Sequence, residues 1–86
     1  MVPRMKASLT FVTRERCPLC EAALPLVEQL ARRAGHTVTI VDVDAAGLGR
    51  RYGDRVPVVL GPDDEEILSG RFDDRAVRRA LRRLGR

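Results

Sequence analysis

The chain has 86 residues, which is enough for one domain and too few for a second hydrophobic core. Hydrophobic residues make up 44% and charged residues 33%, a balance that excludes a disordered chain, and no apolar run is long enough to cross a bilayer. The formal net charge is +4, which would suit nucleic acid. With two Phe, one Tyr and no Trp, however, the chain has too few aromatic side chains on which nucleic-acid bases could stack.

The first half of the chain predicts a strand, a helix and a second strand. Residues 8–13, SLTFVT, are rich in β-branched residues and bounded by charge, which is typical of a buried strand. From Cys17 or Pro18 to Gly35, apolar residues recur at three- and four-residue spacing, so we expect a helix with one buried face and a left-handed glycine cap. Residues 36–45, HTVTIVDVDA, predict a strand that is covered on both faces. Such a unit has parallel strands.

The second half predicts a short helix, a hairpin and a final helix. Residues 45–53, AAGLGRRYG, indicate a short helix weakened by glycines. Two strands, 56–60 and 65–70, flank a GPDD turn and should pair as a hairpin. The last helix is expected over 73–86, with Asp73 as its N-cap. The resulting order is β-α-β-α-β-β-α, with a four-stranded mixed sheet flanked by helices.

We expect one monomeric domain over 1–86, with its core over about 8–84. The first residues, MVPRMKASLTFV, contain no apolar segment with a small-residue cleavage site, so we expect no secretory signal and a cytoplasmic location. Structural disulfides do not persist in that reducing compartment. The two cysteines should therefore be catalytic, metal-binding or simply buried. Neither a nucleic acid nor a membrane is expected as a partner.

Cys17 and Cys20 form a CPLC motif at the predicted start of the first helix. The first residue of such a pair lies at the helix N-terminus and the fourth lies one turn later on the same side, so the sulfurs can reach disulfide geometry. Cys17 also faces unsatisfied N–H groups and the positive end of the helix dipole, which favour a thiolate. Arg14 and Arg16 add positive charge nearby. This pattern indicates a redox pair.

Two other interpretations of the cysteines remain open. A structural zinc site needs four ligands, and the chain offers its two cysteines and His36. Two ordinary buried cysteines are the second alternative, since free Cys often behaves as a small hydrophobe. The predicted helix start and Pro18 favour redox chemistry over both, and we expect no bound metal.

Three features together resemble the glutaredoxins. They are CPLC after the first strand, the dipeptide Val56-Pro57 at the opening of the third, and Gly70 with the acidic pair Asp73 and Asp74. More closely, the chain resembles the small bacterial glutaredoxin-like proteins over nearly its whole length. The resemblance implies the minimal thioredoxin/glutaredoxin-like fold, which agrees with the element order above.

The resemblance also implies roles for the site residues. Cys17 would be the attacking thiolate and Cys20 the resolving thiol. A cis peptide bond would precede Pro57, and the Val56 backbone would pair with the backbone of a substrate cysteine; an edge-strand proline in trans is the alternative. The implied substrate-binding residues are Arg14, Val56, Pro57, Gly70, Asp73 and Asp74.

Three positions depart from the glutaredoxin pattern where the family holds glutathione. Leu19 stands where Tyr is usual, Arg55 replaces Thr, and Arg71 replaces a second Gly. Asp73 and Asp74 match the acidic pair that receives the amino group of glutathione, although a helix cap explains Asp73 equally well. A side chain at Arg71 occupies space that the ligand would use, and screened surface charges do not offset such a block. We expect glutathione to be a poor electron donor.

These observations predict a thiol–disulfide oxidoreductase with no bound cofactor. Its substrates would be protein disulfides or glutathione mixed disulfides, and a reductase or thiol donor would supply electrons. The alternative is a weakly active or redox-inactive binding module that docks an acidic partner through the last helix, although a solvated face is the ordinary explanation of such a charge run. The arginines of that helix are Arg75, Arg78, Arg79, Arg82, Arg83 and Arg86.

Overall fold

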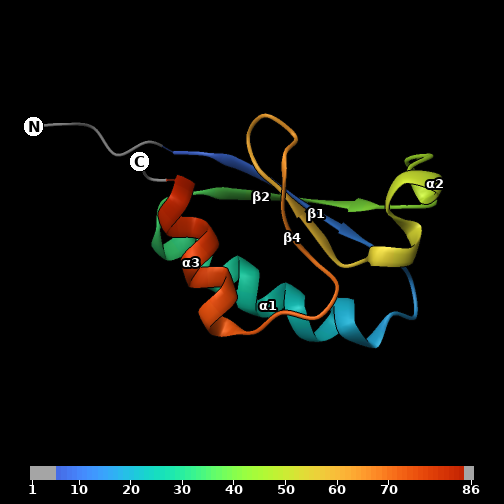
Figure 1. Cartoon of the computed structure of the whole chain (residues 1–86), viewed down its shortest axis with the longest axis horizontal. Helices are drawn as coiled ribbons and strands as arrows, with labels where there is room; N and C mark the ends of the chain where they lie inside the picture. Colours follow the sequence, from blue (N-terminus) through green and yellow to red (C-terminus); the bar gives the residue numbers. More distant parts are fainter. Residues whose placement is uncertain (1–5, 85–86) are drawn as a thin grey trace, which may run out of the picture.

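A four-stranded sheet with helices on both faces forms the centre of the protein (Figure 1). The computed structural model describes residues 6–84. In chain order the elements are β1 (Ser8–Thr13), α1 (Pro18–Arg33), β2 (Thr37–Asp42), α2 (Gly49–Tyr52), the 3-10 helix η1 (Gly53–Arg55), β3 (Val58–Leu60), β4 (Glu66–Ser69) and α3 (Asp74–Leu84). The predicted order of strands and helices is confirmed, with η1 added directly after α2.

The strand order in the sheet is β2-β1-β3-β4, so β1 and β3 are central and β2 and β4 are edge strands. β1 runs parallel to β2, from Ser8 opposite Thr37 to Thr13 opposite Asp42. It runs antiparallel to β3, and β3 runs antiparallel to β4. The predicted parallel pair and the predicted hairpin therefore share one mixed sheet.

Alternating side chains of β1 divide the core between the two faces of the sheet. Leu9 and Phe11 lie in the cluster beneath α1 and α3, and Val12 lies in the cluster beneath α2. Figure 1 shows α1 and α3 together on one side of the sheet and α2 at one end of it. The buried members of the first cluster are Leu9, Phe11, Cys20, Ala23, Val27, Leu30, Ala31, Val59, Val77 and Leu81, and those of the second are Val12, Val43, Tyr52, Val58 and Leu60.

The ends of α1 follow directly from the residues that stand there. Cys17 is the N-cap, with φ −112° and ψ 100°, and a proline follows it in the first turn. At the other end Gly35 has φ +86°, and its N–H donates to Arg32 O while His36 N–H donates to Ala31 O. This pair of bonds is the Schellman arrangement, so the predicted glycine cap is confirmed.

The prediction that the second strand is covered on both faces is wrong. β2 is an edge strand, and Ile40 in its middle is 49% exposed. Val38 is the β2 side chain that packs against the larger core cluster. A run of β-branched residues fits a half-exposed strand as well as a covered one, and the sequence alone does not say which strand is central.

Three boundaries around β2, α2 and β3 differ from the predicted ranges. β2 ends at Asp42 because its carboxylate accepts the N–H groups of Asp44 and Ala45 at 2.9 and 3.0 Å and turns the chain. α2 begins only after Gly47, which has φ +73°. β3 starts at Val58, one residue after a proline that has no N–H for the ladder.

Candidate functional site

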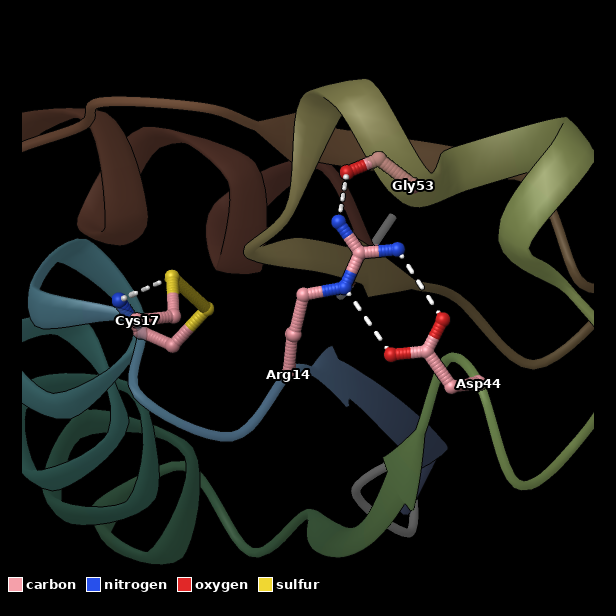
Figure 2. Close-up of a disulfide and its surroundings, with 5 residues drawn as sticks. Arg14, Cys17, Asp44 and Gly53 are labelled. Atoms are coloured by element: carbon pink, nitrogen blue, oxygen red, sulfur yellow. Dashed lines mark hydrogen bonds and ion pairs between the residues drawn. A yellow bond between two sulfur atoms is a disulfide. The ribbon is translucent and has the colours of Figure 1, made fainter.

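The two cysteines lie where β1 gives way to α1. The chain leaves β1 after Thr13 and turns through Arg16, which has φ +57°, to reach Cys17 at the N-cap. The Sγ atom of Cys17 accepts a hydrogen bond from the N–H of Cys20 at 3.2 Å (Figure 2). A sulfur thus takes the place that a Ser or Asp oxygen usually has at a helix N-cap, so negative charge on it would be stabilised by the first turn.

Cys17 and Cys20 form a disulfide across three positions of the chain (Figure 2). Their Cα atoms are 5.2 Å apart, within the range of ordinary disulfides. The two residues differ in burial, because Cys20 is 1% exposed in the core whereas Cys17 is only partly buried. An incoming sulfur can therefore approach Cys17 and not Cys20.

Arg14 is bonded within the protein rather than aimed at the disulfide. Its Nε and Nη2 atoms each donate to one oxygen of Asp44 at 3.0 Å, and Nη1 donates to the carbonyl oxygen of Gly53 at 3.1 Å (Figure 2). The hydrogen bond to Arg14 lowers the pKa of the Asp44 carboxyl, and the same bond raises the pKa of Arg14. Its positive charge near Cys17 is thus largely matched by Asp44. Its predicted contact with a substrate stays a prediction.

The peptide bond between Val56 and Pro57 is cis, which confirms the prediction from the sequence. Pro57 is fully buried, while Val56 is half-buried and extended, with φ −62° and ψ 145°. Cys17 and Val56 pack against the same core cluster, so the fold brings the two predicted site residues to one region. Within the described residues, the carbonyl oxygen of Val56 accepts no hydrogen bond, whereas its N–H ends the 3-10 helix η1.

Gly70 joins this region through its backbone. It has φ +71°, a conformation that disfavours any side chain, and its N–H donates to the carbonyl oxygens of Arg55 and Pro57, both at 2.9 Å. The predicted site residue Gly70 therefore supports the segment on either side of Val56.

The acidic pair lies at the start of α3 and is engaged there. Asp73 Oδ1 accepts the N–H of Ala76 at 2.9 Å, which confirms the helix-cap interpretation. Asp74 pairs with Arg78 one turn later on the same helix. A role of either acid in binding an amino group stays a prediction.

Sequence reasoning missed Asp44, Gly53 and Glu66. Asp44 lies 30 residues from Arg14, and Glu66 at the start of β4 pairs at 2.7 Å with Arg55 at the end of η1. No local spacing connects these partners, because sheet topology alone brings them together. From the sequence, the two acids could have been found only by testing every arginine against every Asp and Glu as a possible ion pair.

The zinc alternative finds no support in the geometry. His36 is buried at the start of β2, and its Nδ1 accepts the N–H of Ala7 at 3.0 Å, whereas Cys17 follows the other end of β1. Over residues 6–84, no three His, Cys, Asp or Glu side chains are grouped so that they could hold a metal ion.

In the same part of the chain, no helix has the length and apolar character needed to cross a membrane.

Comparisons with known proteins agree with this geometry. The family model for the glutaredoxin-like domain (DUF836) matches residues 8–82. No curated protein gives a significant match.

Solved structures that resemble the chain share its fold. Target protein XcR50 from X. campestris is 37% identical, with 87% of this chain and 96% of that chain covered and a TM-score of 0.71. Protein Ne2328 from Nitrosomonas europaea is 26% identical over 92% of this chain and 96% of that one, with a TM-score of 0.73. A mutant thioredoxin from Halobacterium salinarum is 27% identical over 94% and 76%, with a TM-score of 0.72. The thioredoxin-like fold is therefore confirmed.

Proposed function

The chain belongs to the glutaredoxin-like domain family, and from that premise we propose that it is a thiol–disulfide oxidoreductase acting through Cys17 and Cys20. The observation that carries the proposal is the asymmetry of the pair. Cys17 is the partly exposed N-cap of α1 and Cys20 is buried beneath it. An attacking thiolate needs access and a stabilised charge, whereas a resolving thiol needs only to reach its neighbour.

The reaction begins with the pair reduced. The Cys17 thiolate attacks one sulfur of a substrate disulfide, the substrate S–S bond breaks, and the released thiolate takes a proton from water. Cys17 is then held in a mixed disulfide with the other substrate sulfur. Cys20 loses its proton and attacks the Cys17 sulfur, which expels the second substrate thiolate and forms the Cys17–Cys20 disulfide. Two electrons have passed from the protein to the substrate.

The structure of the site supports both halves of this cycle. The N–H of Cys20 already donates to the Cys17 sulfur, so the first turn of α1 stabilises the Cys17 thiolate before attack and again when the disulfide is reduced. The free carbonyl oxygen of Val56 is an acceptor that an extended substrate peptide can use for pairing. A thiol, dithiol or reductase must then return the two electrons. A reducing cytoplasm suits this cycle because it keeps the pair reduced.

Trapping the mixed disulfide tests the proposal. The reduced Cys20→Ser variant is mixed with insulin, and the products are separated under non-reducing conditions and weighed by mass spectrometry. We expect a covalent adduct through Cys17 that a thiol reverses. The matched Cys17→Ser variant should give none, because its remaining sulfur is buried. Equal adducts from both variants, or none from either, would contradict the proposal.

The rival function is a binding module that docks an acidic partner through α3. Exposed arginines on that helix favour it, namely Arg75, Arg78, Arg79, Arg82 and Arg83; Arg86 lies outside the described residues. Arg78 is already paired with Asp74, and exposed arginines are also what an ordinary solvated face contains. Replacing Arg75, Arg79 and Arg82 by Gln separates the functions. The oxidoreductase predicts unchanged attack on insulin, whereas the binding module predicts loss of salt-sensitive binding to an acidic peptide.

A further inference from the structure

We infer that Arg14 is a positioning residue, which with Asp44 and Gly53 fixes the loop carrying Cys17 against the segment that leads to Val56. The inference rests on the proposed function, because it concerns how a protein substrate is held during the exchange. In this role Arg14 does not touch the substrate. It sets the relative placement of the two chain segments that the substrate must reach together.

The two segments need such a link because the sheet does not join them. The ladder between β1 and β3 ends at the pair Val12 and Val58. Beyond that pair, one strand continues into residues 14–17 and the other is preceded by residues 53–57, where Pro57 has no N–H to extend the ladder. Among residues 6–84, one hydrogen bond connects 14–17 with 53–57, and it runs from Arg14 to the Gly53 carbonyl oxygen.

Arg14 can serve as a rigid link because its guanidinium is planar and held on two sides. Both oxygens of Asp44 accept from it, which is the bidentate geometry that fixes the plane of the group. Asp44 is held in turn, since its N–H donates to Asp42 Oδ1 at 2.9 Å. The neighbouring N–H of Val43 donates to Thr13 O at 2.8 Å. Three segments far apart in the sequence are thereby tied at one point beside the cysteines (Figure 2).

The effect of this link should depend on the size of the substrate. A protein disulfide reacts at Cys17 while its backbone pairs with Val56, so it contacts both segments. The relative placement of the segments therefore affects its rate of reaction. A small disulfide reacts at Cys17 alone and does not sense Val56. Misplacement by about 1 Å away from the chemistry can cost roughly a hundredfold in rate, so a partial loss of order should be measurable.

A double-mutant cycle tests the inference. Reduced wild type, Arg14→Ala, Asp44→Ala and the double variant are each oxidised in a single turnover by insulin and by bis(2-hydroxyethyl) disulfide. We expect each single variant to lose about tenfold in the second-order rate constant with insulin, and the double variant to lose no more than either. The rate constants with the small disulfide should stay within about twofold of wild type, because the sulfur and its helix start are unchanged.

Two further variants keep the test independent of charge and of folding. Gly53→Ala keeps every charge, and its backbone at φ −52° and ψ −39° accepts alanine. Its new Cβ would lie 3.0 Å from Arg14 Nη2, so the guanidinium must move, and we expect a loss of about tenfold with insulin. Gly49→Ala is the matched control, because its Cβ would meet Asp44 Oδ1 at an ordinary 3.6 Å.

Arg14→Lys separates positioning from simple charge. A lysine keeps the positive charge near Cys17 but has no planar fork to bridge Asp44 and Gly53, so it should not restore the rate with insulin. Full rescue by Lys, or a wild-type rate in Asp44→Ala, would overturn the inference and favour direct contact of Arg14 with the substrate. Equal losses with both disulfides would also overturn it. A wild type that reacts with neither disulfide would refute the proposed function itself.

Discussion

At the scale of single residues, the site depends on the different positions of the two sulfurs at the start of α1. Cys17 caps α1 and accepts the Cys20 N–H, whereas Cys20 lies in the core with Phe11 and Val27. The chemical identity of the two side chains is the same. Burial and the helix terminus therefore decide which sulfur reacts first.

This difference predicts unequal alkylation. At pH 7 the Cys17 thiol of the Cys20→Ser variant should react with iodoacetamide at least about tenfold faster than the Cys20 thiol of Cys17→Ser, because access and thiolate character both favour Cys17. Quenched samples analysed by mass spectrometry give the two rates. In guanidinium chloride the rates should converge, which is the control. Comparable rates in the folded proteins would contradict the assignment of Cys17 as the attacking and Cys20 as the resolving cysteine.

Charged side chains around the site are engaged with one another. Arg55 donates to Glu66 at 2.8 Å and to the carbonyl oxygen of Arg51 at 3.1 Å, while Arg71 lies exposed directly after Gly70. A glutathione carboxylate would have to displace Glu66 to use Arg55, and it would meet the side chain of Arg71. The ion pair of Arg55 and the bulk of Arg71 both disfavour the binding of glutathione.

Glutathione should accordingly be a poor electron donor, and Arg71→Gly should raise its turnover several-fold by opening space beside the site. Turnover is measured with glutathione and glutathione reductase, against dithiothreitol as the reference donor. Arg71→Lys keeps bulk and charge and should leave the rate unchanged. Fast glutathione-driven turnover by the unmodified protein would sink this prediction and indicate an ordinary glutaredoxin.

At the scale of elements, the position of Asp73 is explained locally by its role as the cap of α3. Asp73 accepts the Ala76 N–H, and the Val77 N–H donates to its carbonyl oxygen, so Asp73 caps α3 and the helix begins directly after it. Buried Val77 and Leu81 then fix the helix against α1. A helix of eleven residues is too short to be stable alone, so its cap and this packing both matter.

Loss of the cap should lower stability measurably. Asp73→Ala should reduce the free energy of unfolding by about 1 kcal/mol, measured in urea, whereas Asp73→Asn should be nearly neutral because asparagine caps equally well. The two variants also separate stability from binding. Reduced turnover with glutathione in Asp73→Asn, at unchanged stability, would show that the carboxylate also contacts the ligand.

At the scale of the whole molecule, the cysteines and the one histidine lie at opposite ends of β1. The N–H of Ala7 donates to His36 Nδ1 just before β1 and β2 pair, while Cys17 follows the far end of β1. Burial lowers the pKa of His36 below its ordinary value. A protonated ring would turn Nδ1 into a donor facing another donor, so the fold favours neutral His36.

Stability should therefore depend on pH through His36. Because the folded state lowers this pKa, the unfolded chain binds more protons below about pH 6.5, and the free energy of unfolding falls as the pH drops from there toward the folded pKa. Thermal unfolding midpoints between pH 8 and pH 5 measure the effect. His36→Asn keeps an acceptor and does not titrate, so the wild type should lose more stability than this control. Parallel curves would contradict the prediction.

Local features of the sequence determined most of the fold and the centre of the site. Helix periodicity, Pro18 at the start and Gly35 at the end define α1, since capping and burial act within a few residues. The CPLC spacing places two sulfurs on one helix turn, which any chain with this motif at a helix start would do. The cis bond before Pro57 came from the resemblance to a family, and the structure confirms it.

Tertiary structure alone decided which strand is central and which charges meet. The TVTIVD segment of β2 has the composition of a covered strand, yet β1 takes the centre and leaves Ile40 exposed. Arg14 meets Asp44 and Gly53 only because parallel β1 and β2 end together and β3 begins beside the end of β1. Periodicity and capping are local, whereas strand order and ion pairing depend on contacts between distant segments, which no window of the sequence contains.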